Sequence, residues 1–145
     1  MSLLSSISVS ASGMSAERER AEVLVENIAN ADTTRTAEGG PYRRRDVVFQ
    51  SDSVSSPFSS VLHNQMDTQV KGVSVSDIII DSSDPERRYM PGHPDADKDG
   101  YVAMPRVNPA QDMVDLLGAS RSYQANVSAI SAVKDMIQKS IDLFR

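Results

Sequence analysis

Three aspartates at alternate positions, Asp95, Asp97 and Asp99, stand before Gly100 like the first half of a calcium-binding loop. An EF-hand loop has oxygen ligands at positions 1, 3 and 5, glycine at 6 and a bidentate glutamate at 12. Position 12 is Arg106 here, and prolines occupy the preceding helix. We therefore expect an acidic turn before a strand. A calcium-regulated binding module is the alternative that this pattern leaves open.

The other candidate sites are weaker. His63 and His93 are the two histidines of the chain and give no ligand cluster, and His93 lies between glycine and proline, where a hydrogen-bonded turn residue is expected. The chain has no cysteine, which excludes disulfides, thiolate metal sites and thiol nucleophiles. We find no serine–histidine–aspartate arrangement and no glycine-rich phosphate loop. We expect no enzyme, no metal, no cofactor and no small-molecule substrate.

A basic run, residues 42–45 (Tyr-Arg-Arg-Arg), could contact phosphate or stack on a base. Asp46 follows it, and the formal net charge of the chain is −5. Nucleic-acid binding needs a basic footprint. We therefore expect no nucleic-acid partner, and a run that is solvated or forms salt bridges between subunits.

The prolines divide the chain into the elements that must position these residues. All seven lie between Pro41 and Pro109, and proline interrupts helices and central strands. We expect an α+β fold with an N-terminal core helix over residues 1–34, a small β-rich and loop middle domain over 35–107, and a C-terminal core helix over 108–145. The two long helices are expected to form a coiled-coil core.

The N-terminal segment has a heptad pattern, in which apolar residues recur at steps of three and four. Its seam positions are Leu4, Ile7, Ala11, Met14, Arg18, Ala21, Val25 and Ile28. Serines and Gly13 crowd the first fifteen residues, and both are poor helix formers. Helix stability in proteins comes mostly from packing. We expect this helix to be disordered, or nearly so, until it docks on neighbours.

The C-terminal helix should begin at Asn108-Pro109, with asparagine as N-cap, proline in the first turn and Gln111 completing a capping box. It would be about 50 Å long and project from any compact body. Its seam positions are Met113, Leu116, Ser120, Tyr123, Val127, Ile130, Lys134, Ile137, Ile141 and Phe144.

The two seams have two possible partners. An antiparallel helical hairpin within one chain would bury each against the other. Seams at both ends of the chain, with a β-rich insert between them, also fit a subunit whose ends build a shared helical core. Asn27 and Asn30, three apart on one face, would tie helix to helix or simply end the first helix.

The middle of the chain reads as strands and loops. Alternation and β-branched residues predict a strand over residues 70–80, with weaker candidates over 47–50 and 101–104. Residues 51–60 are a serine-rich connection. No stretch has the length and apolar character of a membrane span or of a cleaved secretory signal, which suits a cytoplasmic protein or export without cleavage.

Several motifs together resemble the flagellar basal-body rod proteins, most closely proximal-rod proteins of the FlgC type. These motifs are NIANADTTRT (27–36), GGPYRR (39–44), HPDAD (93–97), GYV (100–102), DMVDLL (112–117) and SRSYQANV (120–127). Their order and spacing match from end to end, while residues 51–69 match nothing in that pattern.

The resemblance implies a structural subunit that polymerises through its terminal helices into the rod, the axle that crosses the periplasm and transmits motor torque to the hook. It implies the subunit itself and other rod proteins as partners, and uncleaved passage through the flagellar type III export apparatus. We expect the subunit interface at Ile7, Met14, Val25, Asn27, Ile28, Asn30, Tyr123, Val127, Ile130, Ile137 and Ile141.

Overall fold

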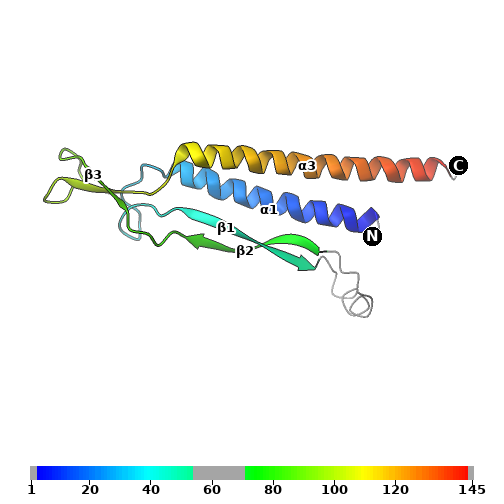
Figure 1. The fold of residues 1–145 in the computed structure, drawn as a ribbon, viewed down its shortest axis with the longest axis horizontal. Helices are drawn as coiled ribbons and strands as arrows, with labels where there is room; N and C mark the ends of the chain where they lie inside the picture. Colours follow the sequence, from blue (N-terminus) through cyan, green and yellow to red (C-terminus); the bar gives the residue numbers. More distant parts are fainter. Residues whose placement is uncertain (1–2, 54–70, 144–145) are drawn as a thin grey trace.

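The computed structural model describes residues 3–53 and 71–143, in which two long helices lie side by side and antiparallel (Figure 1). Helix α1 spans Leu3–Ala29 and helix α3 spans Pro109–Asp142. A small β-rich region lies between them in the chain. The α+β prediction with two long terminal helices is therefore confirmed.

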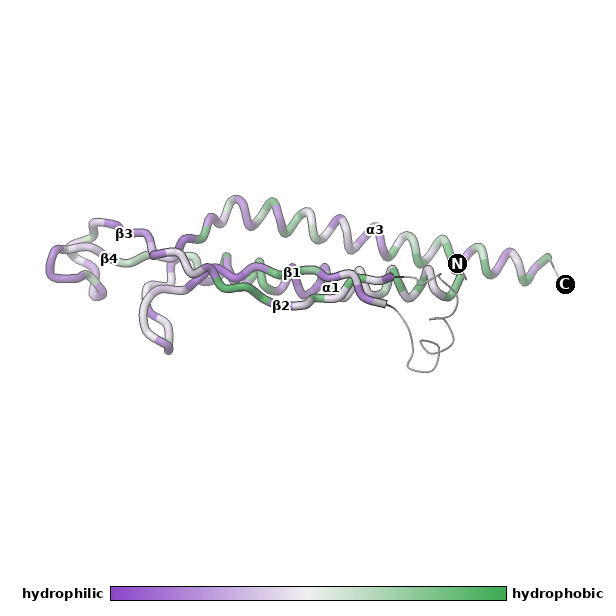
Figure 2. Tube along the Cα trace, turned by 60° about the horizontal axis from the view of Figure 1, so that its bottom comes forward, coloured by the Kyte–Doolittle hydropathy of each residue, from purple (hydrophilic) through white to green (hydrophobic). Residues whose placement is uncertain are grey.

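The start of α3 follows the predicted N-cap and proline chemistry. Asn108 has extended backbone, and its Oδ1 accepts hydrogen bonds from the backbone N–H groups of Ala110 at 3.2 Å and Gln111 at 3.4 Å. Pro109 occupies the first turn, where its missing N–H has no cost. With 34 residues, α3 is about 51 Å long, and its C-terminal end extends past the N-terminal end of α1 (Figure 2).

The middle of the chain forms two antiparallel hairpins. Strand β1 (Arg45–Ser53) pairs with β2 (Lys71–Ile80), with an irregularity in register after Val48, and β3 (Glu86–Tyr89) pairs with β4 (Tyr101–Met104). All three expected strands are present. Strand β3 was not predicted, because its sequence ERRY lacks alternating apolar residues. The serine-rich connection forms the end of β1 and otherwise lies outside the described residues, as does His63.

Helix α1 is the central element of the molecule. The β1–β2 hairpin packs along it on one side and α3 on another, while the β3–β4 hairpin extends beyond the end of the helix pair (Figure 1). The core is thin. Within the described residues, the buried apolar side chains are those of Ala16, Val23, Leu24, Tyr42, Val102, Met104, Ala119 and Val133. Many large apolar side chains, such as Leu4 and Val25, therefore remain exposed on the surface of the subunit.

Candidate assembly surfaces

The acidic turn around Asp95 and Asp97 is stabilised by hydrogen bonds and an ion pair within the chain. Asp95 accepts a hydrogen bond from the Thr34 hydroxyl at 2.8 Å and pairs with Arg35 at 3.4 Å. Asp97 Oδ1 accepts from two backbone N–H groups within the turn, and His93 Nδ1 accepts from the backbone N–H of Asp95. Among the described residues no three His, Cys, Asp or Glu side chains gather as a metal site. The carboxylates of Asp95 and Asp97 are therefore engaged by groups of the chain, and His93 is the hydrogen-bonded turn residue expected.

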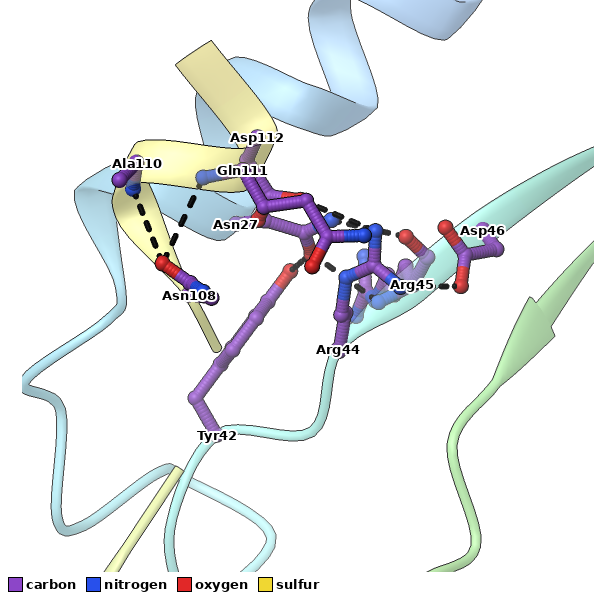
Figure 3. Close-up of polar contacts among 9 residues, drawn as sticks. All are labelled: Asn27, Tyr42, Arg44, Arg45, Asp46, Asn108, Ala110, Gln111 and Asp112. Atoms are coloured by element: carbon purple, nitrogen blue, oxygen red, sulfur yellow. Dashed lines mark hydrogen bonds and ion pairs between the residues drawn. The ribbon is translucent and has the colours of Figure 1, made fainter. Parts of the chain in front are cut away.

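Asn27 joins α1 to the start of β1. Its side chain is fully buried; Nδ2 donates to the carbonyl of Arg45 at 2.8 Å, and Oδ1 accepts from the N–H of Arg45 at 3.0 Å (Figure 3). The Tyr42 hydroxyl donates to the same Oδ1 at 2.9 Å. The side-chain amide of Asn27 thus bonds both the N–H and the carbonyl of Arg45, as a hydrogen-bonded residue on a neighbouring antiparallel strand would. The expectation of Asn27 at a subunit interface is wrong, because its side chain has no exposed surface.

Arg44 joins β1 to the first turn of α3. Its guanidinium donates to Asp112 Oδ1 and to Asp46 Oδ2, both at 2.9 Å (Figure 3). The Asp112 side chain is 1% exposed. Burial of Arg44 works against its charge, but the hydrogen bond to Asp112, together with the nearby carboxylates, outweighs this and raises the pKa of Arg44. Asn27, Tyr42, Arg44 and Asp112 are called the polar joint below.

The basic run is therefore used within the chain. Besides the bonds of Arg44, Arg45 pairs with Glu26 at 2.9 Å. Arg44 and Arg45 form their salt bridges within the subunit, while Arg43 is exposed and the Arg45 side chain stays 41% exposed, so the run is partly solvated as expected. The reason is positional: β1 starts beside the acidic end of α1 and the first turn of α3.

Asn30 ends α1. Its Nδ2 donates to the carbonyl of Glu26 at 3.0 Å, and its Oδ1 accepts from the Thr33 hydroxyl at 3.1 Å. These bonds satisfy groups at the helix terminus. Asn30 thus follows the alternative in which the segment simply terminates the helix.

The heptad seam of α1 does not form the intrachain core. None of its eight positions is buried, whereas Ala16, Val23, Leu24 and Asn27 are. At 3.6 residues per turn, six seam positions lie on the opposite side of the helix from these buried residues: Arg18, whose side chain is 75% exposed and pairs with Glu22, and five apolar ones. We call the five apolar positions the outward seam: Leu4, Ile7, Ala11, Met14 and Val25. Leu4 is 73% and Val25 52% exposed, while Ile7, Met14 and Ile28 are half-buried.

The seam of α3 is only partly used. Ile130 and Ile137 are half-buried, but Tyr123, Val127 and Ile141 are exposed and lie on the flank of the covered side. The covered side follows Asp112, Ala119 and Val133 instead. The antiparallel helical hairpin, one of the two alternatives, is present, but the residues buried on each helix are not those of the seams. Small residues set the approach instead: a side chain at Gly13 would lie 3.1 Å from the Asn126 amide.

Comparison with known proteins matches each helix to a family model of flagellar rod proteins. A family model described as "Flagella basal body rod protein" matches residues 7–35, and one described as "Flagellar basal body rod FlgEFG protein C-terminal" matches residues 98–143. FlgC of Bacillus subtilis (strain 168) is 44% identical over 150 residues, which cover 99% of each chain. FlgC of Borreliella burgdorferi is 39% identical over 100% of this chain and 99% of that protein. FlgC of Salmonella typhimurium is 38% identical over 99% and 98%.

The chain belongs to the FlgC family of flagellar basal-body rod proteins. It is a structural subunit of the rod in the flagellar basal body, as the sequence motifs implied. None of the helices described for this rod protein is long and apolar enough to cross a membrane.

In this rod protein, the polar joint is the feature that sequence reasoning missed. Tyr42, Arg44 and Asp112 are buried or half-buried, yet each type is common on surfaces. One signal was available. Asp112 stands in the first turn of a capped helix, where a carboxylate is favoured, and the GGPYRR motif supplies its cation.

Proposed function

We propose that this rod protein polymerises with copies of itself and with other rod proteins through two apolar surfaces. One is the outward seam of α1, together with Ile28 at its edge. The other is the side of α3 that carries Tyr123, Val127, Ile130, Ile137 and Ile141. The observation that carries the proposal is the exposure of Leu4 and Val25, apolar seam residues on the side of α1 opposite its buried residues. Burying such area gains roughly 25 cal/mol per Å².

The polymer would form part of an axle that crosses the periplasm and transmits motor torque to the hook. Contacts between different surfaces of successive copies produce open helical assemblies, which suits an axle. A serine-rich first helix with marginal propensity also suits a subunit that passes uncleaved through the type III export apparatus before it folds fully. No catalytic role is proposed, because the family is one of structural proteins.

Val25→Lys tests the proposal by placing a charge in the outward seam. A lysine at this exposed position leaves the subunit folded but costs several kcal/mol if it must be buried at an interface. We expect the variant to be absent from purified basal bodies and the cells to lose motility. Glu19→Lys, at an exposed and already charged position of α1, is the matched control and should assemble. Normal incorporation of Val25→Lys would contradict the proposal.

A further inference from the structure

The C-terminal end of α3 has no helix beside it. Gly13 of α1 lies against Asn126 of α3. The two antiparallel helices have the same rise per residue, so ten residues along either one cover the same distance. Leu3 precedes Gly13 by ten residues and Met136 follows Asn126 by ten. Leu3 is therefore level with Met136. Helix α3 continues to Asp142, about 9 Å further (Figures 1 and 2). We call residues 134–142, the last three residues level with α1 and the six beyond it, the overhang.

The overhang presents one apolar face. Ile137 and Ile141, four residues apart, continue the stripe of Ala119 and Val133 by which α3 is buried higher up. Along this stripe Ile137 is half-buried, and Ile141, nearer the end of the helix, is 63% exposed. At 3.6 residues per turn Lys134 is the charge that flanks this face, and it forms no ion pair with any described residue.

A groove lies at the other end of the helix pair. Its apolar lining comes from α1 (Val23 and Leu24) and β1 (Val47 and Phe49), and its volume is about 260 Å³. This is below the roughly 300–1,000 Å³ of small-molecule sites and suits inserted side chains. The charged groups around it are those of Arg20, Arg45, Asp46 and Asp115.

Asp115 differs from the other three charges of the groove. Arg20, Arg45 and Asp46 each have an ion-pair partner in the chain, at 3.9, 2.9 and 2.9 Å. Asp115 has none among the described residues. The groove therefore offers one unpaired carboxylate beside an apolar floor, and the overhang offers one unpaired ammonium beside an apolar face.

We propose that the overhang of one copy binds in the groove of a second copy of this chain, with Ile137 and Ile141 against the apolar lining and Lys134 paired with Asp115. The contact cannot form within one chain, because Asp115 and Ile141 are about 39 Å apart along the same helix. Head-to-tail contacts of this kind propagate as an open filament. This inference rests on the proposed polymerisation and specifies one of its contacts.

The absence of cysteine in the native chain makes a disulfide test clean. Phe49→Cys combined with Ile141→Cys should give disulfide-linked multimers on mild oxidation of purified basal bodies, since a disulfide requires Cα atoms about 4.4–6.8 Å apart. Phe49→Cys with Gln124→Cys, an exposed site on α3 outside the overhang, is the matched control and should stay unlinked.

Charge reversal tests the ion pair in the cross-linking variant. Asp115→Lys or Lys134→Asp should each lower the linked fraction roughly fivefold, and the two together should restore it. Incorporation of the cross-linking variant into basal bodies without formation of the engineered disulfide would overturn this contact and leave the proposed polymerisation intact. A variant that does not enter basal bodies is oxidised as concentrated purified protein, where absence of the disulfide also overturns the contact. Failure of the native chain to assemble under any condition would overturn both.

Discussion

The two ends of α1 are held in different ways. At the C-terminal end, Asn27 is fully buried and receives or donates three hydrogen bonds, two with the backbone of Arg45 and one with Tyr42. At the N-terminal end, residues 3–16 contain no charged side chain and many serines. Two of these, Ser8 and Ser12, bond carbonyls of their own helix. The first end is fixed by buried side-chain bonds, whereas at the second the Ser12 hydroxyl accepts a hydrogen bond from the exposed backbone N–H of Val73 at 3.1 Å.

This difference indicates that the two ends of α1 have different roles, one in subunit stability and the other in assembly. The polar joint sets where β1 and α3 start relative to α1, so the subunit has a defined shape before it meets a neighbour. The serine-rich end gains little from its own propensity and leaves apolar residues such as Leu4 exposed. We therefore expect mutations at the joint to change subunit stability, and mutations at the serine-rich end to change assembly.

Asn27→Ala should have the largest effect on stability. It removes the Asn27 partner of the part-buried N–H and carbonyl of Arg45 and of the buried Tyr42 hydroxyl, which should cost about 3 kcal/mol. Urea denaturation of the purified subunit measures it. Asn30→Ala is the matched control, because it removes only the two part-buried bonds at the helix end and should cost about 1 kcal/mol. An equal loss in the free energy of unfolding for Asn27→Ala and Asn30→Ala would contradict the distinction between the polar joint and the helix end.

Asp112→Ala should have the next largest effect, about 2 kcal/mol. It removes the buried carboxylate that Arg44 pairs with and leaves the guanidinium half-buried with Asp46 alone. Asp115→Ala, three residues along the same helix and without an ion pair, should change the free energy of unfolding by less than about 0.5 kcal/mol. A similar loss for both would mean that the joint does not depend on the Arg44–Asp112 pair.

Tyr42 gives the joint a pH dependence. Burial, and then the Glu26 carboxylate, raise the pKa of Tyr42. The neutral phenol is favoured in the folded chain, so its contribution to stability is fully present below the unfolded pKa of about 10 and is lost as the pH rises through the folded pKa. Tyr42→Phe should cost about 1 kcal/mol at neutral pH and reduce the alkaline loss.

Urea midpoints at pH 8 and pH 10.5 measure this difference. Tyr123→Phe, at an exposed tyrosine of α3, is the control and should keep the alkaline loss of the native chain. An unchanged alkaline loss in Tyr42→Phe would show that another group carries it.

The glycines should show the smallest effects. Gly118→Ala in α3 meets nothing within 4 Å and should stabilise the subunit by about 0.5–1 kcal/mol. Gly13→Ala should gain less, because the new methyl group must displace the Asn126 amide. Thermal unfolding of the two variants compares them. A larger gain from Gly13→Ala would show that the helices do not approach closely at the serine-rich end.

The sequence predicted the parts of this fold that local chemistry decides. Asn108 and Pro109 marked the start of α3, and β-branched residues marked β2. The side of α1 that is buried could not be predicted from apolar periodicity, because α1 is covered by two different elements and approaches α3 at Gly13, which has no side chain. The role of Asn27 depends on Arg45, eighteen residues away, and only the tertiary fold brings them together.

Hydrogen exchange of the purified monomer, followed residue by residue along α1 and α3, tests the central claim most directly. We predict fast exchange over residues 3–16 and 125–142, and slow exchange over 23–29 and 102–119, where the polar joint and the buried Val102 lie. In assembled basal bodies, the fast segments should become protected. Uniformly slow exchange along both helices in a verified monomer would contradict a subunit that completes its folding on its neighbours.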